Sequence, residues 1–229
     1  MIEGIKVVGF DADDTLWENQ KYYLETESKF RQLLAPYVSE DVVLKELAAT
    51  EDSNISLYGY GVKAHILSVI ETAIRITDAK VPVEVIGKIL LLGKEQLRRP
   101  VELLDGVEDT LSALEGRYRL VVVTKGDLLD QEGKLRRSGI DHFFCHAEIV
   151  SDKTDEAYIT LLRRMNIKPE EFLMIGNAMR SDILPPLRIG SYAIHIPFST
   201  TWAHEDVDEA VQSPRLHTLK SMRDVVSLL

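Results

Sequence analysis

Residues 5–16 read IKVVGFDADDTL, an apolar run that ends in three aspartates within four positions. The apolar part, residues 5–10, predicts a buried β-strand. Carboxylates packed together repel one another unless a cation, a proton or water compensates their charge, so a structural role alone seldom explains such a cluster. We therefore expect the end of this strand to be a site with a nucleophile, a proton shuttle and a metal ion.

The composition describes an ordinary globular protein with room for one catalytic unit and an insertion. The chain has 229 residues, of which 45% are hydrophobic and 28% charged, and its formal net charge is -10. This negative charge opposes nonspecific binding to nucleic acid and to anionic membrane surfaces. The chain contains neither a long apolar run nor a signal-peptide pattern, so we expect a cytoplasmic protein without a membrane partner.

Cys145 is the single cysteine, so an intrachain disulfide is excluded and a reducing compartment is favoured. We expect its side chain to be small and buried.

His195 lies inside an apolar run, which favours a hydrogen-bonded strand residue over a catalytic base. Trp17 is expected to pack rather than to bind substrate. Trp202 and His204 lie in a polar stretch, where structural uses are more common than a place at a site entrance.

Two periodicities divide the chain. Residues 18–99 carry apolar residues at three- and four-residue spacing, which predicts about four helices, one beginning near Ser39 and another near Pro82. After residue 100, short apolar runs alternate with amphipathic segments. This second pattern predicts a parallel sheet with crossover helices, to which residues 5–10 belong. We therefore expect an α/β core of residues 1–17 and 100–229, with a helical domain of residues 18–99 inserted in it.

The expected core elements can be placed along the chain. Residues 119–123, 172–175 and 192–196 predict strands, and residues 219–229 predict a last helix. Gly139 predicts a helix end, and a further helix is expected to begin near Asp155.

Suggestive residues follow four of the expected strands. They are Asp11 to Thr15, Thr124-Lys125-Gly126, Lys153, and Asn177 to Asp182. The carboxyl ends of parallel strands meet at one edge of a sheet, so these groups can share a site. Taken alone, a Thr-x-Gly sequence is more often a turn, a lone lysine is more often solvated, and an aspartate near a helix start more often offsets the helix dipole.

The four groups occur together and in order, and in this they resemble motifs I to IV of the haloacid dehalogenase-like (HAD) hydrolase superfamily, most of whose members are phosphatases. The resemblance extends over the chain outside the inserted helices. It implies a Rossmann-like core and a helical cap of the C1 type. It also implies a Mg2+-dependent phosphomonoester hydrolase that acts on a small phosphorylated metabolite through an aspartyl-phosphate.

The resemblance also implies a role for each residue. Asp11 would be the nucleophile, Asp13 the proton shuttle and Lys153 the neutralising cation. The phosphoryl group would be bound by Thr124, Lys125 and Gly126, and Mg2+ by Asp11, the backbone carbonyl of Asp13, and Asp182. Thr15 and Asn177 would support the site. Asn177 departs from many HAD phosphatases, which carry an acid there, and this departure predicts weaker metal binding.

Several alternatives stay open at this stage. A 2-haloacid dehalogenase is disfavoured because that branch generally lacks an acid at the position of Asp13. A phosphonatase would use a cap lysine, but nothing singles out Lys63, Lys88 or Lys94. A phosphomutase, or a HAD-fold protein that binds a phosphorylated ligand without turnover, is also compatible. Neither the oligomeric state, monomer or homodimer, nor the physiological substrate follows from the sequence.

Overall fold

β1 (Val7–Phe10) lies inside a parallel sheet, and all four of its residues are buried. The computed structural model describes residues 2–200, 205 and 211–229. The strand order is β3-β2-β1-β4-β5-β6, and every neighbouring pair is parallel. The other strands are β2 (Arg119–Lys125), β3 (His146–Val150), β4 (Phe172–Gly176), β5 (Tyr192–His195) and β6 (Leu216–Thr218). The predicted parallel α/β fold is confirmed.

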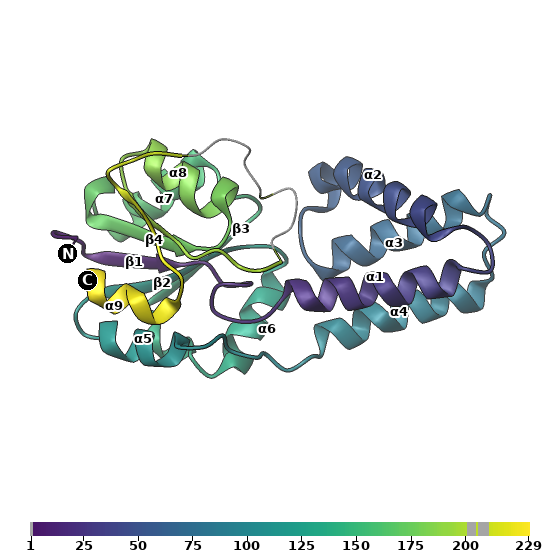
Figure 1. Cartoon of the computed structure of the whole chain (residues 1–229), viewed down its shortest axis with the longest axis horizontal. Helices are drawn as coiled ribbons and strands as arrows, with labels where there is room; N and C mark the ends of the chain where they lie inside the picture. The colour runs from purple at the N-terminus through teal and green to yellow at the C-terminus, as the bar shows by residue number, and fades with distance from the viewer. Residues whose placement is uncertain (1, 201–204, 206–210) are drawn as a thin grey trace. The chain divides into compact units, whose positions relative to one another are not determined.

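Helices cover both faces of this sheet, which explains why its strands are apolar on both sides. Val8 and Phe10 pack with Leu111 of α5 (Val107–Leu114) and Val225 of α9 (Val225–Leu228). Val7 belongs to a second apolar cluster, which includes residues of α7 (Asp155–Met165). Figure 1 shows α5 and α9 on one face, with α7 and α8 (Leu184–Arg188) on the other. Short 3-10 helices are η1 (Asp141–Phe143), η2 (Pro169–Glu171) and η5 (Met222–Asp224).

Local hydrogen bonds and a glycine fix the ends of two helices that follow strands of the sheet. α6 (Leu128–Ser138) begins after Asp127, whose side chain accepts a hydrogen bond from the Asp130 amide. It ends at Gly139, whose φ of 76° is the left-handed conformation typical of such stops. At the start of α7, the Thr154 side chain accepts from the Ala157 amide. The helix end predicted at Gly139 and the start predicted near Asp155 are therefore confirmed.

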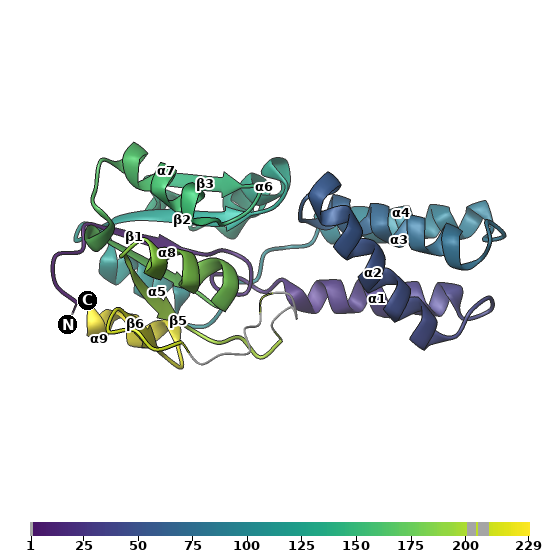
Figure 2. The same ribbon diagram turned by 90° about the horizontal axis from the view of Figure 1, so that it is seen from above.

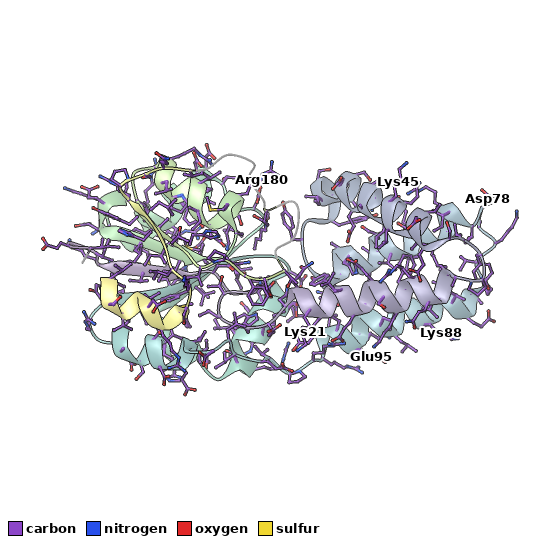
Figure 3. The ribbon with its side chains drawn as sticks, in the orientation of Figure 1. Lys21, Lys45, Asp78, Lys88, Glu95 and Arg180 are labelled. Carbon is purple, nitrogen blue, oxygen red and sulfur yellow. The ribbon has the colours of Figure 1, made fainter. Side chains whose placement is uncertain are left out.

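The chain divides into two compact units. The first comprises Met1–Gln20 and Val101–Leu229, and the second comprises Lys21–Pro100. The second unit consists of α1 (Gln20–Leu34), α2 (Glu40–Tyr58), α3 (Val62–Ile76) and α4 (Val83–Leu97), which Figure 2 shows as a helical bundle. Its apolar core includes Phe30, Val43, Val69 and Ile89, one from each helix. Charged side chains such as those of Lys45, Asp78 and Lys88 lie on its outside (Figure 3).

Within the first unit, the two chain segments that lead into and out of the helical bundle are hydrogen bonded to each other. The Glu18 amide donates to the Glu102 carbonyl at 3.0 Å, and the Leu104 amide donates to the Leu16 carbonyl at 3.0 Å. Trp17 forms an antiparallel bridge with Leu103 between these two bonds. The insertion therefore begins and ends at a paired stem.

The C-terminal end differs from the sequence prediction. The expected helix over residues 219–229 is replaced by η5 and a single turn, α9, and the edge strand β6 precedes them. β6 has only three residues and follows no clear alternation, so its pairing with β5 depends on tertiary context. Among the described residues, no helix is long and apolar enough to cross a membrane.

Candidate active site

The parallel register brings the four predicted groups to one edge of the sheet. β1 lies between β2 and β4, so Asp11, which follows β1, lies between the ends of those strands. The Asp11 amide donates to the Ile175 carbonyl at 2.9 Å, which extends the β1–β4 pairing into the site. Lys153 reaches this point from the loop after β3, and Asp182 reaches it from the segment after β4.

Lys153 lies between two carboxylates at the centre of the site. Its ammonium donates to Oδ1 of Asp11 and to Oδ1 of Asp182, the latter at 2.6 Å. The side chains of Lys153 and Asp182 are 2% and 0% exposed. Removing such charges from water is costly unless they are paired, so this triad holds its members in place.

The electrostatics of the triad follow from burial and charge. Burial alone would lower the pKa of Lys153, but the carboxylates of Asp11 and Asp182 raise it above its ordinary value. Burial, and then the charge of Asp182, raise the pKa of Asp11 to about 7, against the opposing effect of Lys153. The site therefore carries more negative charge than one ammonium compensates.

Asp182 is held by a single-turn π-helix, η3 (Met179–Ile183), which joins β4 to α8. π-turns of this kind occur frequently at functional sites. Oδ2 of Asp182 accepts from the Ala178 amide at 3.0 Å. Gly176 ends β4 directly beneath this side chain, and a Cβ there would collide with the Asp182 carboxyl. A glycine is thus required for Asp182 to reach Lys153.

Thr15 connects the loops after β1 and β4. Its hydroxyl lies 3.0 Å from Oδ2 of Asp11 and 3.1 Å from Oδ1 of Asn177, and it accepts from the Asn177 amide. Asp14 adopts a left-handed φ of 61°, and its carboxylate accepts from the amides of Asn19 and Gln20 at the start of α1. These contacts shape the loop that follows Asp11.

The Asp13 carboxylate is surrounded by three donors. Nε1 of Trp17 lies 2.6 Å from Oδ1, and Nζ of Lys134 lies 2.9 Å from Oδ1 and 3.1 Å from Oδ2. Nε2 of Gln131 lies 3.2 Å from Oδ2. Trp17 is buried as expected, but it also has this polar contact. Sequence reasoning missed Lys134 and Gln131, because polar residues on an amphipathic helix give no sign of which partner they face.

The group after β2 is only partly arranged as predicted. Oγ1 of Thr124 is 2.6 Å from Nε2 of Gln131, so this hydroxyl is near Asp13. The Gly126 amide, expected to bind phosphate, donates instead to the Val150 carbonyl at 3.3 Å. The reason is that this bond is the last one between β2 and β3, whose register ends at Lys125 and Val150. Gly126 has a φ of 136°, which glycine adopts without strain.

Lys125 also has an unexpected partner, because its ammonium pairs with Glu205. Glu205 in turn accepts from the Ser181 hydroxyl at 2.8 Å. Burial opposes ionisation of Glu205, but Lys125 outweighs that effect and lowers its pKa. Trp202 and His204, considered above as entrance residues, lie outside the described residues.

Two other expectations have clear outcomes. Nε2 of His195 is 3.0 Å from the Asn177 carbonyl, which confirms a hydrogen-bonded strand residue. The expectation that Cys145 is buried is wrong, because its side chain is exposed. It immediately precedes β3, which is an edge strand of the sheet formed by the described residues.

The donor set is of the kind that Mg2+ prefers. The carboxylate of Asp11, the backbone carbonyl of Asp13 and the amide oxygen of Asn177 are hard oxygen ligands, and a divalent cation would offset the negative charge around Asp11. The described residues contain no group of three or more His, Cys, Asp or Glu side chains arranged to hold a metal ion. Both oxygens of Asp182 are already hydrogen bonded, so its role as a direct ligand stays a prediction.

Comparison with known proteins agrees with this architecture. The family model described as haloacid dehalogenase-like hydrolase matches residues 5–190. The chain belongs to this family. A solved HAD-like hydrolase from Xanthomonas campestris superimposes with a TM-score of 0.89 at 36% identity, covering 98% of this chain and 90% of that one. The match confirms the HAD fold.

Curated relatives of this HAD hydrolase are named as phosphatases. A glyceraldehyde 3-phosphate phosphatase of Methanothermobacter thermautotrophicus is 29% identical over 216 residues, covering 88% of this chain and 90% of the relative. One of Methanopyrus kandleri is 26% identical over 199 residues, covering 84% of each. The expectation of a HAD-family hydrolase is confirmed, and both of these relatives are named as phosphatases.

Proposed function

We propose that this HAD hydrolase is a Mg2+-dependent phosphomonoesterase that acts on a small phosphorylated metabolite through an aspartyl-phosphate on Asp11. The observation that carries the proposal is the buried Lys153, whose ammonium donates to both Asp11 and Asp182. Asp13 follows two residues after Asp11 in the same loop. A nucleophile, a cation to bind the phosphoryl oxygens and a second carboxyl are the groups that a two-step phosphoryl transfer requires.

In the first step, an oxygen of Asp11 attacks phosphorus and the bond from phosphorus to the ester oxygen breaks. Asp13 gives its proton to the departing alkoxide. In the second step, Asp13 takes a proton from water as the water oxygen attacks phosphorus, and inorganic phosphate and free Asp11 result. The covalent step replaces one difficult displacement with two easier ones.

Lys153 and Thr124 would bind the transferring group. The Lys153 ammonium is held beside Asp11 before substrate arrives, so little reorganisation is needed when the phosphoryl charge enters. The Asp182 carboxylate fixes the other side of this ammonium. We expect Asp182 to act largely through Lys153, because its side chain has no exposure.

Mg2+ would be held by Asp11 and the backbone carbonyl of Asp13, with Asp182 or Asn177 as a further oxygen ligand. Bound there, it supplies positive charge that draws an anionic phosphate toward an otherwise repelling carboxylate. Asp11 must be ionised to attack, and its raised pKa implies that the site depends on such compensation.

For the substrate, the named activity of the relatives suggests a starting point. We propose a small phosphomonoester, with glyceraldehyde 3-phosphate among the first compounds to assay. The acid at Asp13 favours phosphatase over dehalogenase chemistry, because an ester oxygen leaves more easily with a proton whereas a halide needs none.

The test is hydrolysis of p-nitrophenyl phosphate by the full chain with Mg2+ and with EDTA, compared with Asp11→Asn. We expect metal-dependent turnover that the variant loses, which also excludes a contaminating phosphatase. Lys29→Met, which removes an exposed lysine of the helical bundle, is the matched control and should keep full activity. Turnover that survives Asp11→Asn would refute the assignment of the nucleophile.

A further inference from the structure

We propose that Lys134 of α6, assisted by Gln131, is a positioning residue that aims the Asp13 carboxyl at the leaving group. This inference rests on the proposed function, since it assumes that Asp13 transfers a proton. Its basis is the set of contacts around one carboxylate. Both oxygens of Asp13 lie within 3.1 Å of the Lys134 ammonium, so the cation spans the carboxylate rather than touching one corner.

Lys134 is itself held in place. Its side chain is 14% exposed, and its ammonium also lies 3.0 Å from Oδ1 of Asn19 and 3.8 Å from Oδ2 of Asp130. These partners come from separate parts of the chain, because Asp130 lies one helical turn earlier on α6 whereas Asn19 directly precedes α1. A long flexible lysine with three acceptors has little freedom left, so it can hold Asp13 in one orientation.

Gln131 connects Asp13 to the group that would bind phosphate. Its Nε2 lies 2.6 Å from Oγ1 of Thr124, 3.2 Å from Oδ2 of Asp13 and 3.2 Å from the Lys125 carbonyl. The Gln131 side chain is buried, and a flipped amide would place its oxygen against these acceptors. One side chain therefore contacts both the proton shuttle and Thr124.

Gln131 and Lys134 are three residues apart, so they lie on the same face of α6. The helix that carries them is capped by Asp127 at its start and by Gly139 at its end. Because Trp17 also donates to Oδ1, the Asp13 carboxyl is bound both by a residue of its own loop and by a separate helix. The arrangement restricts rotation of a group whose direction decides which oxygen receives its proton.

The experiment measures kcat/KM of the full-length protein for a series of substituted phenyl phosphates. kcat/KM reports the step in which the leaving group departs, and the most acidic phenols depart without a proton. Lys134→Met keeps the length of the stem but removes the ammonium. Lys134→Arg restores a cation. Arg136→Met, on the same helix with its side chain 61% exposed, is the matched control.

We expect Lys134→Met to lower kcat/KM by about 10- to 100-fold for unsubstituted phenyl phosphate, and by less than about 3-fold for the most acidic leaving group. In Lys134→Met, kcat/KM should depend more steeply on the acidity of the leaving group than it does in the wild type. Lys134→Arg should restore the shallower dependence in part. Arg136→Met should show the same dependence as the wild type. A uniform loss across the series, with thermal unfolding unchanged, would overturn the inference. If the wild-type protein hydrolyses neither this series nor glyceraldehyde 3-phosphate, the proposed function fails, and with it this inference.

Discussion

The Thr15 hydroxyl makes two contacts with Asn177, because its Oγ1 lies 3.1 Å from the backbone N and 3.1 Å from Oδ1 of that residue. The hydroxyl also lies 3.0 Å from Oδ2 of Asp11. Two segments of the site, the loops after β1 and β4, therefore meet at one small side chain. All three residues are less than one-tenth exposed, so the bonds are formed away from water.

Replacing Thr15 with valine, which keeps the shape and removes the hydroxyl, should leave the buried Asn177 amide without its acceptor. We expect a loss of about 1–3 kcal/mol in the free energy of unfolding, measured with urea, together with lower phosphatase activity. Thr15→Ser keeps the hydroxyl and should retain most of both. Equal stability of the valine and serine variants would show that this bond contributes little.

Asn177→Asp should strengthen Mg2+ binding, because it adds negative charge at an oxygen already near Asp11. We expect the dissociation constant for Mg2+, measured by calorimetry without substrate, to fall about tenfold. Gln32→Glu adds the same charge on the exposed surface of α1 and serves as the control. Unchanged affinity in Asn177→Asp would place residue 177 outside the ligand set.

The helical bundle offers a pH-dependent prediction that is independent of the site. Arg99 near the end of α4 donates to Glu25 of α1 and lies 4.5 Å from the Tyr22 ring centroid. The hydrogen bond from Arg99, opposed by burial, lowers the pKa of Glu25 below its ordinary value of 4.5. A carboxyl with a lowered pKa in the folded state stabilises that state above the ordinary pKa, and the contribution is lost as the pH falls through the folded-state value.

Glu25→Gln should therefore reduce the free energy of unfolding at pH 7, by less than about 1 kcal/mol because the pair is partly exposed. The difference from the wild type should vanish in strongly acidic solution, where both carry a neutral side chain. Urea unfolding across a pH series measures it. Glu95→Gln, which removes only an exposed contact with Lys29 at 4.0 Å, should show no such trend. A difference that persisted in acid would point to packing instead.

Two glycines of α4 should respond in opposite ways to alanine. A Cβ at Gly87 would meet no atom within 4 Å, so Gly87→Ala should raise stability by about 0.5–1 kcal/mol through its better helix propensity. A Cβ at Gly93 would lie 2.5 Å from Cγ1 of Ile66 on α3, so Gly93→Ala should destabilise the bundle. Thermal unfolding of both variants gives the comparison, and stabilisation by Gly93→Ala would contradict the close packing of α3 and α4.

The parts of the fold that follow from periodic hydrophobicity were predictable. Val7–Phe10 and residues 172–175 are short apolar stretches, and both lie in buried strands at the middle of the sheet. Because these strands are parallel, their carboxyl ends had to meet, and the meeting of Asp11, Lys153 and Asp182 follows from topology. Membership in the HAD family could be inferred from the same residues.

The finer arrangement was not predictable, because it depends on contacts between distant residues. The Gly126 amide donates to the Val150 carbonyl of β3, and no local sequence pattern indicates this hydrogen bond. Gln131 and Lys134 are ordinary polar helix residues in the sequence, and only the packing of α6 brings them to Asp13. The chemical class of the site could be predicted from its residue types, whereas the orientation of its side chains required the tertiary structure.

The paired stem at Leu16–Glu18 and Glu102–Leu104 makes the helical bundle a replaceable module. The Glu18 amide and the Glu102 carbonyl are already 3.0 Å apart, a spacing that a short hairpin turn closes. Gene rearrangement or protein engineering could thus exchange the bundle for another insert, or omit it, without lengthening either strand of the stem. One catalytic sheet can in this way be combined with different inserted domains.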